Sequence, residues 1–235
     1  GVEALAERFA VSLQTIRRDL SDLADAGHLD RVHGGAVMRI GVVNYAYEER
    51  RRMHEDAKAA IGRACARAIP DNSSVILNLG TTTEAVAREL LGHRNITVVT
   101  NNINVANRMR PYTQFEVVIA GGVVRSSDGG IVGEAAVDFI RQFKVDYAVI
   151  GTSAIDHDGA LLDYDFREVK VAQAIIANAR QVILVADSTK FERTAPVRIG
   201  HLEQVDTFVT DRCPDERVRK ICRDFDVELI ETMPD

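Results

Sequence analysis

Apolar residues recur at helical spacing in two segments near the start of the chain. In the first segment they are Val2, Leu5, Ala6 and Phe9, and in the second Leu13, Ile16, Leu20 and Leu23. Ser12, between the segments, is a good N-cap residue, and Gly27 suits the residue that follows a helix end. The pattern predicts two helices joined by a short turn, which is typical of a helix-turn-helix.

Two short alternating stretches follow within residues 28–36, with Gly34 and Gly35 between them. Adjacent glycines favour a tight turn, so these residues are predicted to form a two-stranded β-wing.

The remainder of the chain alternates between β-branched runs and helical stretches from Lys58 onward. The predicted strands cover residues 74–78, 96–100, 115–119, 145–150, 181–186 and 205–210. The predicted helices cover residues 84–91, 102–109, 134–143, 167–179 and 216–225. This alternation predicts an α/β domain with a mostly parallel sheet and helices on both of its faces.

Polar loops follow five of the predicted strands, and ligands of such sheets bind at the carboxyl ends of the strands. The loop residues are Gly80, Thr81, Thr82, Thr83, Thr100, Asn101, Asn102, Gly121, Gly122, Gly151, Thr152, Ser153, Asp187 and Lys190. In any single loop, Thr as a cap and Gly as a turn residue is the simpler explanation. Five such loops together indicate a ligand site, and hydroxyls, helix N–H groups and a lysine suit a phosphate.

Two acidic residues, Asp163 and Glu168, are further ligand candidates, although helix-surface charge is the better explanation for at least one of them. Glu168 and Lys170 are two residues apart and do not share a helix face, so no catalytic pair is implied.

Composition narrows the class of protein. The 235 residues include 3 cysteines, with no spacing that indicates a disulfide framework or a metal site. No apolar run is long enough to span a membrane and no leader begins the chain, so a cytoplasmic protein without metal or cofactor is expected.

Charge alone does not indicate DNA binding. The net charge is −6, and residues 1–54 contain 8 Lys and Arg against 8 Asp and Glu. DNA binding is therefore inferred from the motif, in which the second helix would enter the major groove. The candidate contacts are Ser12, Gln14, Thr15, Arg17, Arg18, Arg31 and His33. The triplet Arg50–Arg52 is interpreted as solvated surface.

The motif residues resemble the DNA-binding signature of DeoR-type repressors. The resemblance covers Phe9–Leu20, Leu23, Gly27, Arg31 and His33–Ala36, and it continues through Thr100–Asn107, Ala120–Gly122, Ser127–Ala135, Asp138–Phe143 and Asp187–Phe191. It implies a sensor domain with the fold of ribose-5-phosphate isomerases and a small phosphorylated inducer. Similarity within the family favours sn-glycerol 3-phosphate as inducer and genes of glycerol metabolism as targets.

The resulting expectation is a winged helix-turn-helix over residues 1–36 that lacks its first helix, a linker over 37–57, and a sensor domain over 58–235. Operator DNA and the metabolite are the expected partners, with a homodimer or homotetramer as the assembly. The alternatives are a repressor that responds to a different sugar phosphate and a sugar-phosphate isomerase or deaminase. The scattered histidines provide no evident general base for such an enzyme.

Overall fold

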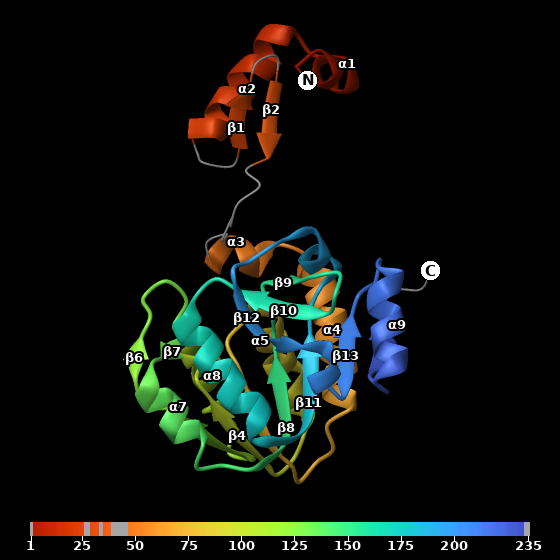
Figure 1. Ribbon diagram of the computed structural model, residues 1–235. Helices are drawn as coiled ribbons and strands as arrows, with labels where there is room; N and C mark the ends of the chain where they lie inside the picture. Colours follow the sequence, from red (N-terminus) through yellow and green to blue (C-terminus); the bar gives the residue numbers. More distant parts are fainter. Residues whose placement is uncertain (1, 26–28, 33–34, 39–46, 233–235) are drawn as a thin grey trace. The chain divides into compact units, whose positions relative to one another are not determined.

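The computed structural model describes residues 2–25, 29–32, 35–38 and 47–232 (Figure 1). The chain divides into two compact units, Gly1–Asn44 and Tyr45–Asp235. Residues 47–57, which the sequence analysis assigned to the linker, form helix α3 (Tyr47–Arg52) and the start of α4 (Glu55–Arg67), and they belong to the second unit.

The first unit consists of helices α1 (Val2–Phe9) and α2 (Leu13–Asp25) and a hairpin of β1 (Leu29–Val32) and β2 (Gly35–Met38). The Ser12 hydroxyl accepts a hydrogen bond from the backbone N–H of Thr15 at 3.1 Å, so Ser12 caps α2 as predicted. The two strands pair antiparallel, which agrees with the predicted wing. His33 and Gly34, which were assigned to the wing, and Gly27 lie outside the described residues.

The core of the first unit is smaller than the sequence pattern predicts. Ile16 and Leu20 are buried together with Ala6. Leu13 and Leu23 are 42% and 43% exposed, however, and Phe9 is 62% exposed. Their placement in the buried face was wrong, because the described part of this unit covers only one narrow stripe of α2.

A seven-stranded parallel sheet forms the centre of the second unit, in the order β14-β13-β11-β8-β3-β4-β5. The strands are β3 (Ser74–Leu77), β4 (Ile96–Thr100), β5 (Phe115–Ile119), β8 (Val145–Ile150), β11 (Ala179–Val185), β13 (Thr207–Thr210) and β14 (Glu228–Glu231). All six neighbouring pairs are parallel. The predicted parallel sheet is therefore confirmed.

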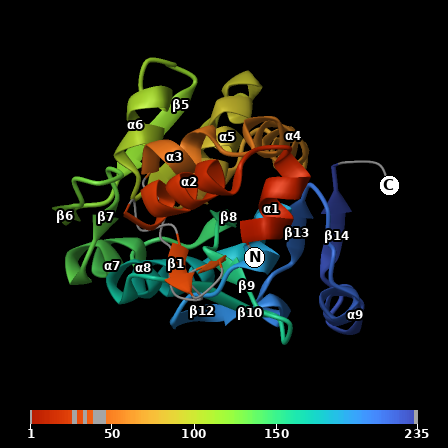
Figure 2. The same cartoon turned by 90° about the horizontal axis from the view of Figure 1, so that it is seen from above.

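Helices cover both faces of this sheet, as Figure 2 shows. On one face α4, α5 (Thr81–Glu89) and α6 (Ile103–Met109) bury residues such as Ile61, Val86 and Met109. On the other, α7 (Glu134–Ile140), α8 (Phe166–Ala177) and α9 (Glu216–Asp224) bury residues such as Ile140, Ile175 and Val218. Alternate residues of β8 enter the two cores: Ala148 faces one and Val149 the other.

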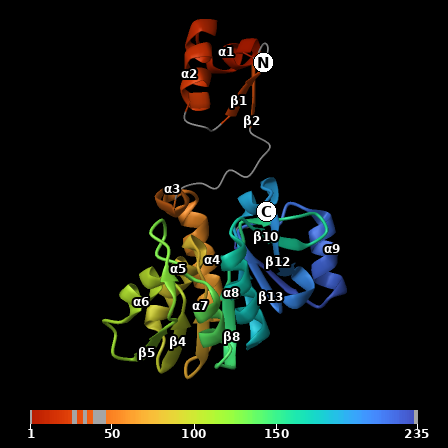
Figure 3. The same cartoon turned by 60° about the vertical axis from the view of Figure 1, so that its left-hand side comes forward.

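Short strands that the sequence analysis did not predict lie outside the main sheet. The strands β9 (Ala154–Ile155), β10 (Ala160–Asp163) and β12 (Val197–His201) form a second sheet, and β6 (Val123–Val124) pairs with β7 (Ile131–Val132). Figure 1 shows β9, β10 and β12 at the end toward which β8 and β11 point, and α3 lies at the same end (Figure 3). The carboxyl edge of the main sheet is therefore covered by added structure.

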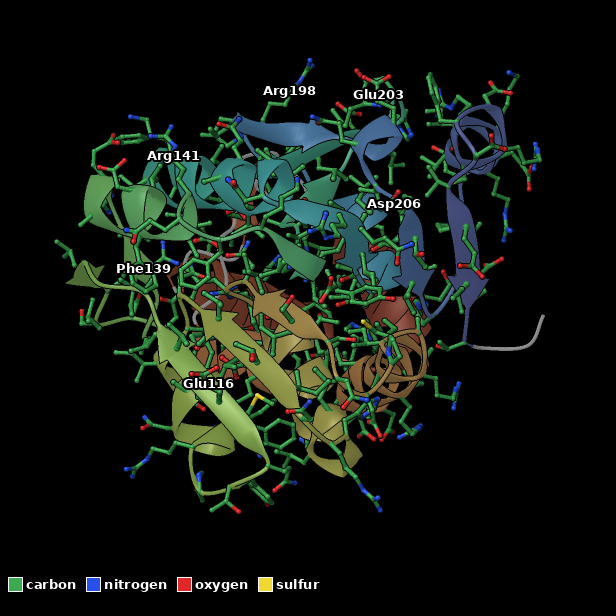
Figure 4. All side chains as sticks on the ribbon, turned by 90° about the horizontal axis from the view of Figure 1, so that it is seen from below. Glu116, Phe139, Arg141, Arg198, Glu203 and Asp206 are labelled. Carbon is green, nitrogen blue, oxygen red and sulfur yellow. The ribbon has the colours of Figure 1, made fainter. Side chains whose placement is uncertain are left out.

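At the amino ends of the strands, polar groups form hydrogen bonds with neighbouring residues. Asp206, labelled in the view from below (Figure 4), accepts a hydrogen bond from the backbone N–H of Val182 at 2.7 Å. The Ser74 hydroxyl and N–H both donate to Asp146, at 2.7 and 2.9 Å. These carboxylates already have hydrogen-bond partners at this end of the strands. None of the helices in the described part of the chain is long and apolar enough to cross a membrane.

Candidate functional site

The order of the strands in the sheet changes direction between β3 and β8. From β3 the sheet extends through β4 and β5, whereas from β8 it extends through β11 and β13 in the opposite direction. Ligands of open α/β sheets bind at such a switch point. Gly151 follows β8 there, and a Cβ atom on it would lie 3.7 Å from the Leu79 carbonyl and 3.9 Å from that of Val185.

The loop after β3 presents the open N-terminus of α5 at this edge. Gly80 has φ of 142°, and it provides no side chain to cap the helix. The backbone N–H of Glu84 donates a hydrogen bond to the Gly80 carbonyl at 3.0 Å. The hydroxyls of Thr81 and Thr82 make no hydrogen bond to any described residue. Unpaired N–H groups and hydroxyls at a helix start are favourable partners of an anion.

Three of the predicted threonines have structural roles instead. The Thr83 hydroxyl donates to the carbonyls of Asn78 and Gly80 at 2.8 and 2.7 Å, which closes the loop. Thr100 donates to the Leu77 carbonyl at 2.7 Å. Thr152 donates to the carbonyls of Ala154 and Leu162 and so shapes the small sheet. These hydrogen bonds fit the simpler explanation, in which each hydroxyl satisfies the local backbone.

Two buried amides at the same edge are incompletely satisfied. Asn78, at the end of β3, is 2% exposed, and Asn101, after β4, is fully buried. The Oδ1 atom of each has no hydrogen-bond partner, although the Nδ2 of Asn101 donates to the Ile131 carbonyl at 3.3 Å. Since buried polar atoms are normally paired, two unpaired acceptors at one strand edge indicate that a donor group binds there.

Lys190 provides a cation at the end of β11. It lies in the short helix η2 (Ser188–Glu192), which Asp187 caps and which Asp211 holds through the N–H and hydroxyl of Ser188. Burial lowers the pKa of Lys190 to about 8. Asp187 opposes this shift, and Arg193, Arg50 and Lys58 lower the pKa further. Lys190 therefore lies among several positive charges, an arrangement that an anion would stabilise.

Asp163 and Glu168 are not surface charges. Asp163 is 8% exposed and accepts a hydrogen bond from the Ser153 hydroxyl at 3.2 Å. Glu168 accepts one from Arg125 at 2.6 Å. Burial, and then the neighbouring Asp163, raise the pKa of Glu168 to about 7, while burial also raises that of Asp163. The possibility that one of them is merely helix-surface charge was wrong. Lys170, in contrast, pairs with the exposed Glu134 at 2.8 Å.

Arg125 organises this acidic group. Its guanidinium binds Asp128 through two hydrogen bonds of 2.9 and 2.6 Å, and it also binds Asp165 at 3.1 Å. A cluster of carboxylates around a single arginine can accept hydrogen bonds from the hydroxyls of a polyol. No group of three or more His, Cys, Asp or Glu in the described part of the chain is arranged to hold a metal ion.

The structure does not bring all of the predicted loop residues to this site. Gly121 is exposed, and a side chain there would meet nothing within 4 Å. Gly122 has φ of 146°, and its Cβ would lie 3.0 Å from Ile131, so packing against β7 requires this glycine. Asn102 caps α6 and donates to Glu84 at 3.0 Å. These residues support the edge of the sheet.

Several residues at the edge were missed from the sequence. Asn78 was not among the predicted ligand residues, and neither Arg125 nor Asp128 was singled out, because nothing in a local pattern distinguishes them. Arg50 was interpreted as solvated surface, and this was wrong: its side chain is 23% exposed and its Nε atom is buried. Arg51, the next residue, is 52% exposed. Only the packing of α3 distinguishes the two arginines.

Helix α2 of the first unit carries four of the seven residues that were predicted to contact DNA. Gln14, Thr15, Arg17 and Arg18 are exposed on α2, opposite the buried Ile16 and Leu20. Thr15 and Ser12 share a hydrogen bond of 2.8 Å between their hydroxyls, which links both to the helix start. Arg31 lies on β1 and His33 outside the described residues.

Comparison with known proteins agrees with this two-part architecture. Residues 1–39 match the family described as the DeoR-like helix-turn-helix domain, and residues 53–212 match the DeoR C terminal sensor domain. The chain belongs to the DeoR family. The chain is 45% identical to the glycerol-3-phosphate regulon repressor of Escherichia coli, over 97% of this chain and 90% of that protein. It is 40% identical to the transcriptional repressor CsqR of the same organism, over 97% and 88%.

Among solved structures, eIF2B beta from Chaetomium thermophilum matches with a TM-score of 0.50 and 16% identity, over 73% of this chain and 54% of that chain. This match concerns the fold alone. Since the relatives of this DeoR-family chain are named transcriptional repressors, it is a transcriptional repressor and not an enzyme. These relatives give no support to the alternative of a sugar-phosphate isomerase or deaminase.

Proposed function

We propose that this DeoR-family protein is a cytoplasmic, homo-oligomeric repressor of glycerol and glycerol 3-phosphate metabolism. It binds its operator through α2 and the β1–β2 wing. It is released when sn-glycerol 3-phosphate binds at the carboxyl edge of the seven-stranded sheet.

The unpaired polar groups at this edge are the main observation in favour of a phosphorylated polyol. The N-terminus of α5, the hydroxyls of Thr81 and Thr82, and Lys190 suit the phosphate. The unpaired Oδ1 atoms of Asn78 and Asn101 suit the hydroxyl groups. The identity of the metabolite is inferred from the name of the relative that is 45% identical.

Mobility-shift assays test this proposal. The DNA is the promoter region of the glycerol uptake genes in the organism that encodes this protein. Addition of glycerol 3-phosphate is expected to weaken operator binding by about 5- to 150-fold, because allosteric coupling is typically about 1–3 kcal/mol. Unchanged operator binding would rule out this metabolite as the inducer. Calorimetric titration of this protein with other phosphorylated polyols and sugars would then identify the metabolite to which it responds.

Lys190→Ala tests the site. A charge-assisted hydrogen bond contributes about 1.5–3 kcal/mol, so we expect the affinity for glycerol 3-phosphate to fall about tenfold or more. Operator affinity without metabolite should stay at the wild-type value. Lys220→Ala is a matched control, since Lys220 on α9 is 68% exposed and pairs with Asp224 of the same helix. A normal response of Lys190→Ala would exclude this lysine from the site.

A further inference from the structure

Helix α3 is attached to the edge of the sheet that forms the proposed ligand site. The Tyr47 hydroxyl donates to Glu84 Oε2 at 2.7 Å, and Asn104 Nδ2 donates to the Tyr47 hydroxyl at 3.0 Å. Glu84 lies in the first turn of α5, and Asn104 in the first turn of α6. Helix α3 therefore contacts α5 and α6, the helices that follow β3 and β4.

A buried lysine holds the other end of α3. Lys58, on α4, is 5% exposed, and its ammonium donates to the carbonyl of Arg50 and, at 2.6 Å, to that of Met53. Burial lowers the pKa of Lys58, Arg193 and Arg50 lower it further, and Asp187 opposes these shifts. The ammonium thus satisfies carbonyls at the end of α3, which fixes the backbone at Arg50.

The Arg50 side chain lacks the partners that a buried guanidinium normally has. Its Nε atom is buried and has no hydrogen-bond partner. Its NH2 atom lies 3.6 Å from Asp128 Oδ2, which is too long for a hydrogen bond. Asp128 itself is already bound by Arg125 at 2.9 and 2.6 Å. Arg50 is therefore held beside an acid that another arginine satisfies.

The charges around Arg50 indicate what it binds. The Lys58 ammonium donates to the Arg50 carbonyl, and both Arg50 and Lys58 lower the pKa of Lys190. Arg50 and Arg125 both lower the pKa of Asp163, so Arg50 also interacts with the acidic group around Arg125. Three neighbouring cations, together with the unpaired Nε of Arg50, favour a multiply charged anion. A guanidinium binds phosphate through two parallel hydrogen bonds.

We propose that Arg50 of α3 binds the phosphate of the inducer together with Lys190, so that the inducer acts directly on the helix that leads to the DNA-binding unit. This inference rests on the proposed function and adds a ligand contact from outside the sheet. The chain runs from α3 through residues 39–46 to the first unit. A phosphate that binds Arg50 stabilises one position of α3, and the operator-bound state responds to that position.

The test compares Arg50→Gln with Arg51→Gln in the full-length protein. Both variants remove one charge from the same helix, but Arg51 is 52% exposed and lies 4.0 Å from Glu48. Calorimetric titration with sn-glycerol 3-phosphate is expected to show at least tenfold weaker binding for Arg50→Gln and a change of less than twofold for Arg51→Gln. Operator release by the metabolite should be lost in the first variant only.

Arg50→Lys and the melting temperatures separate ligand binding from folding. The lysine keeps the charge but not the paired donors, so its affinity should lie between those of the wild type and Arg50→Gln. Weakened binding by Arg50→Lys with an unchanged melting temperature of the free protein supports the proposal even where Arg50→Gln is unstable.

Two results would overturn the inference in distinguishable ways. Wild-type affinity in both Arg50 variants, together with loss of binding in Lys190→Ala, would exclude α3 from the site and leave the proposed function intact. Failure of the wild-type protein to bind glycerol 3-phosphate would refute the proposed inducer, and the role of Arg50 with it.

Discussion

Lys190 illustrates how one residue acquires a function from its surroundings. Its sequence context, in a polar loop that follows a predicted strand, indicated only an anion contact. In the structure, burial and the cations Arg193, Arg50 and Lys58 lower its pKa to about 8, against the opposing effect of Asp187. The ammonium is therefore poorly stabilised in the free protein, and a bound phosphate would stabilise it.

This shift predicts that inducer affinity depends on pH. In the free protein Lys190 loses its proton near pH 8, whereas a bound phosphate dianion raises its pKa. Binding above pH 8 must then include uptake of a proton. The dissociation constant of glycerol 3-phosphate should be constant between pH 7 and 7.5 and should rise above pH 8 by up to about tenfold per pH unit.

Calorimetry from pH 7 to 9.5 measures this dependence, and the phosphate stays a dianion throughout, since its second pKa is about 6. Lys190→Arg is the control: a guanidinium stays charged in this range, so its affinity should not change with pH. Equal pH profiles of the wild type and Lys190→Arg would show that the protonation of Lys190 is not coupled to binding of the phosphate.

Six of the seven strands of the main sheet were predictable because a buried strand has a local pattern, whereas β14 was not predicted. Strands β4, β5 and β8 have the predicted bounds, and α6, α8 and α9 lie within a residue or two of theirs. The short strands β6, β7, β9 and β10 were not predictable, since two to four residues show no period. Helix α3 was missed for a related reason: Tyr47–Arg52 is a charged segment whose helix depends on contacts with Glu84 and Lys58.

The same distinction applies to the site. Loops that follow regular strands, such as those at Gly80 and Asp187, could be located from the sequence. The pairing of Arg125 with Asp128, Asp165 and Glu168 joins residues up to 43 positions apart, and no local pattern contains that information.

Helix α2 also allows a prediction about DNA binding. Arg18 is exposed on the face opposite the buried Ile16 and Leu20, where a recognition helix contacts base edges. Arg18→Ala is expected to lower operator affinity by about 1–3 kcal/mol, while glycerol 3-phosphate affinity stays the same. Fluorescence anisotropy with labelled operator measures the change, and Arg8→Ala on α1 is the control. An equal effect of both substitutions would mean that α2 has no specific role in recognition.

At the scale of the whole molecule, the two units differ greatly in the size of their cores. The described core of the first unit contains Ala6, Ile16 and Leu20, whereas two extensive clusters fill both faces of the second unit's sheet. Less buried apolar surface means a lower free energy of local unfolding. The first unit should therefore open far more often than the second.

Hydrogen exchange of the full-length protein measures this difference. Amides of α2 should exchange at least tenfold faster than those of β8 and β11, and glycerol 3-phosphate should slow exchange in the second unit only. Exchange of both units at one common rate would mean that they unfold as a single cooperative body.

The attachment of α3 has a consequence for how such repressors diversify. The ammonium of Lys58 binds carbonyl oxygens of α3, and every amino acid has a carbonyl. Substitutions along α3, other than at Tyr47, leave its attachment in place. With Arg50 in the inducer site, mutations in one short helix can alter inducer selectivity while the sheet keeps its structure. A duplicated gene could in this way acquire a new metabolic signal in few steps.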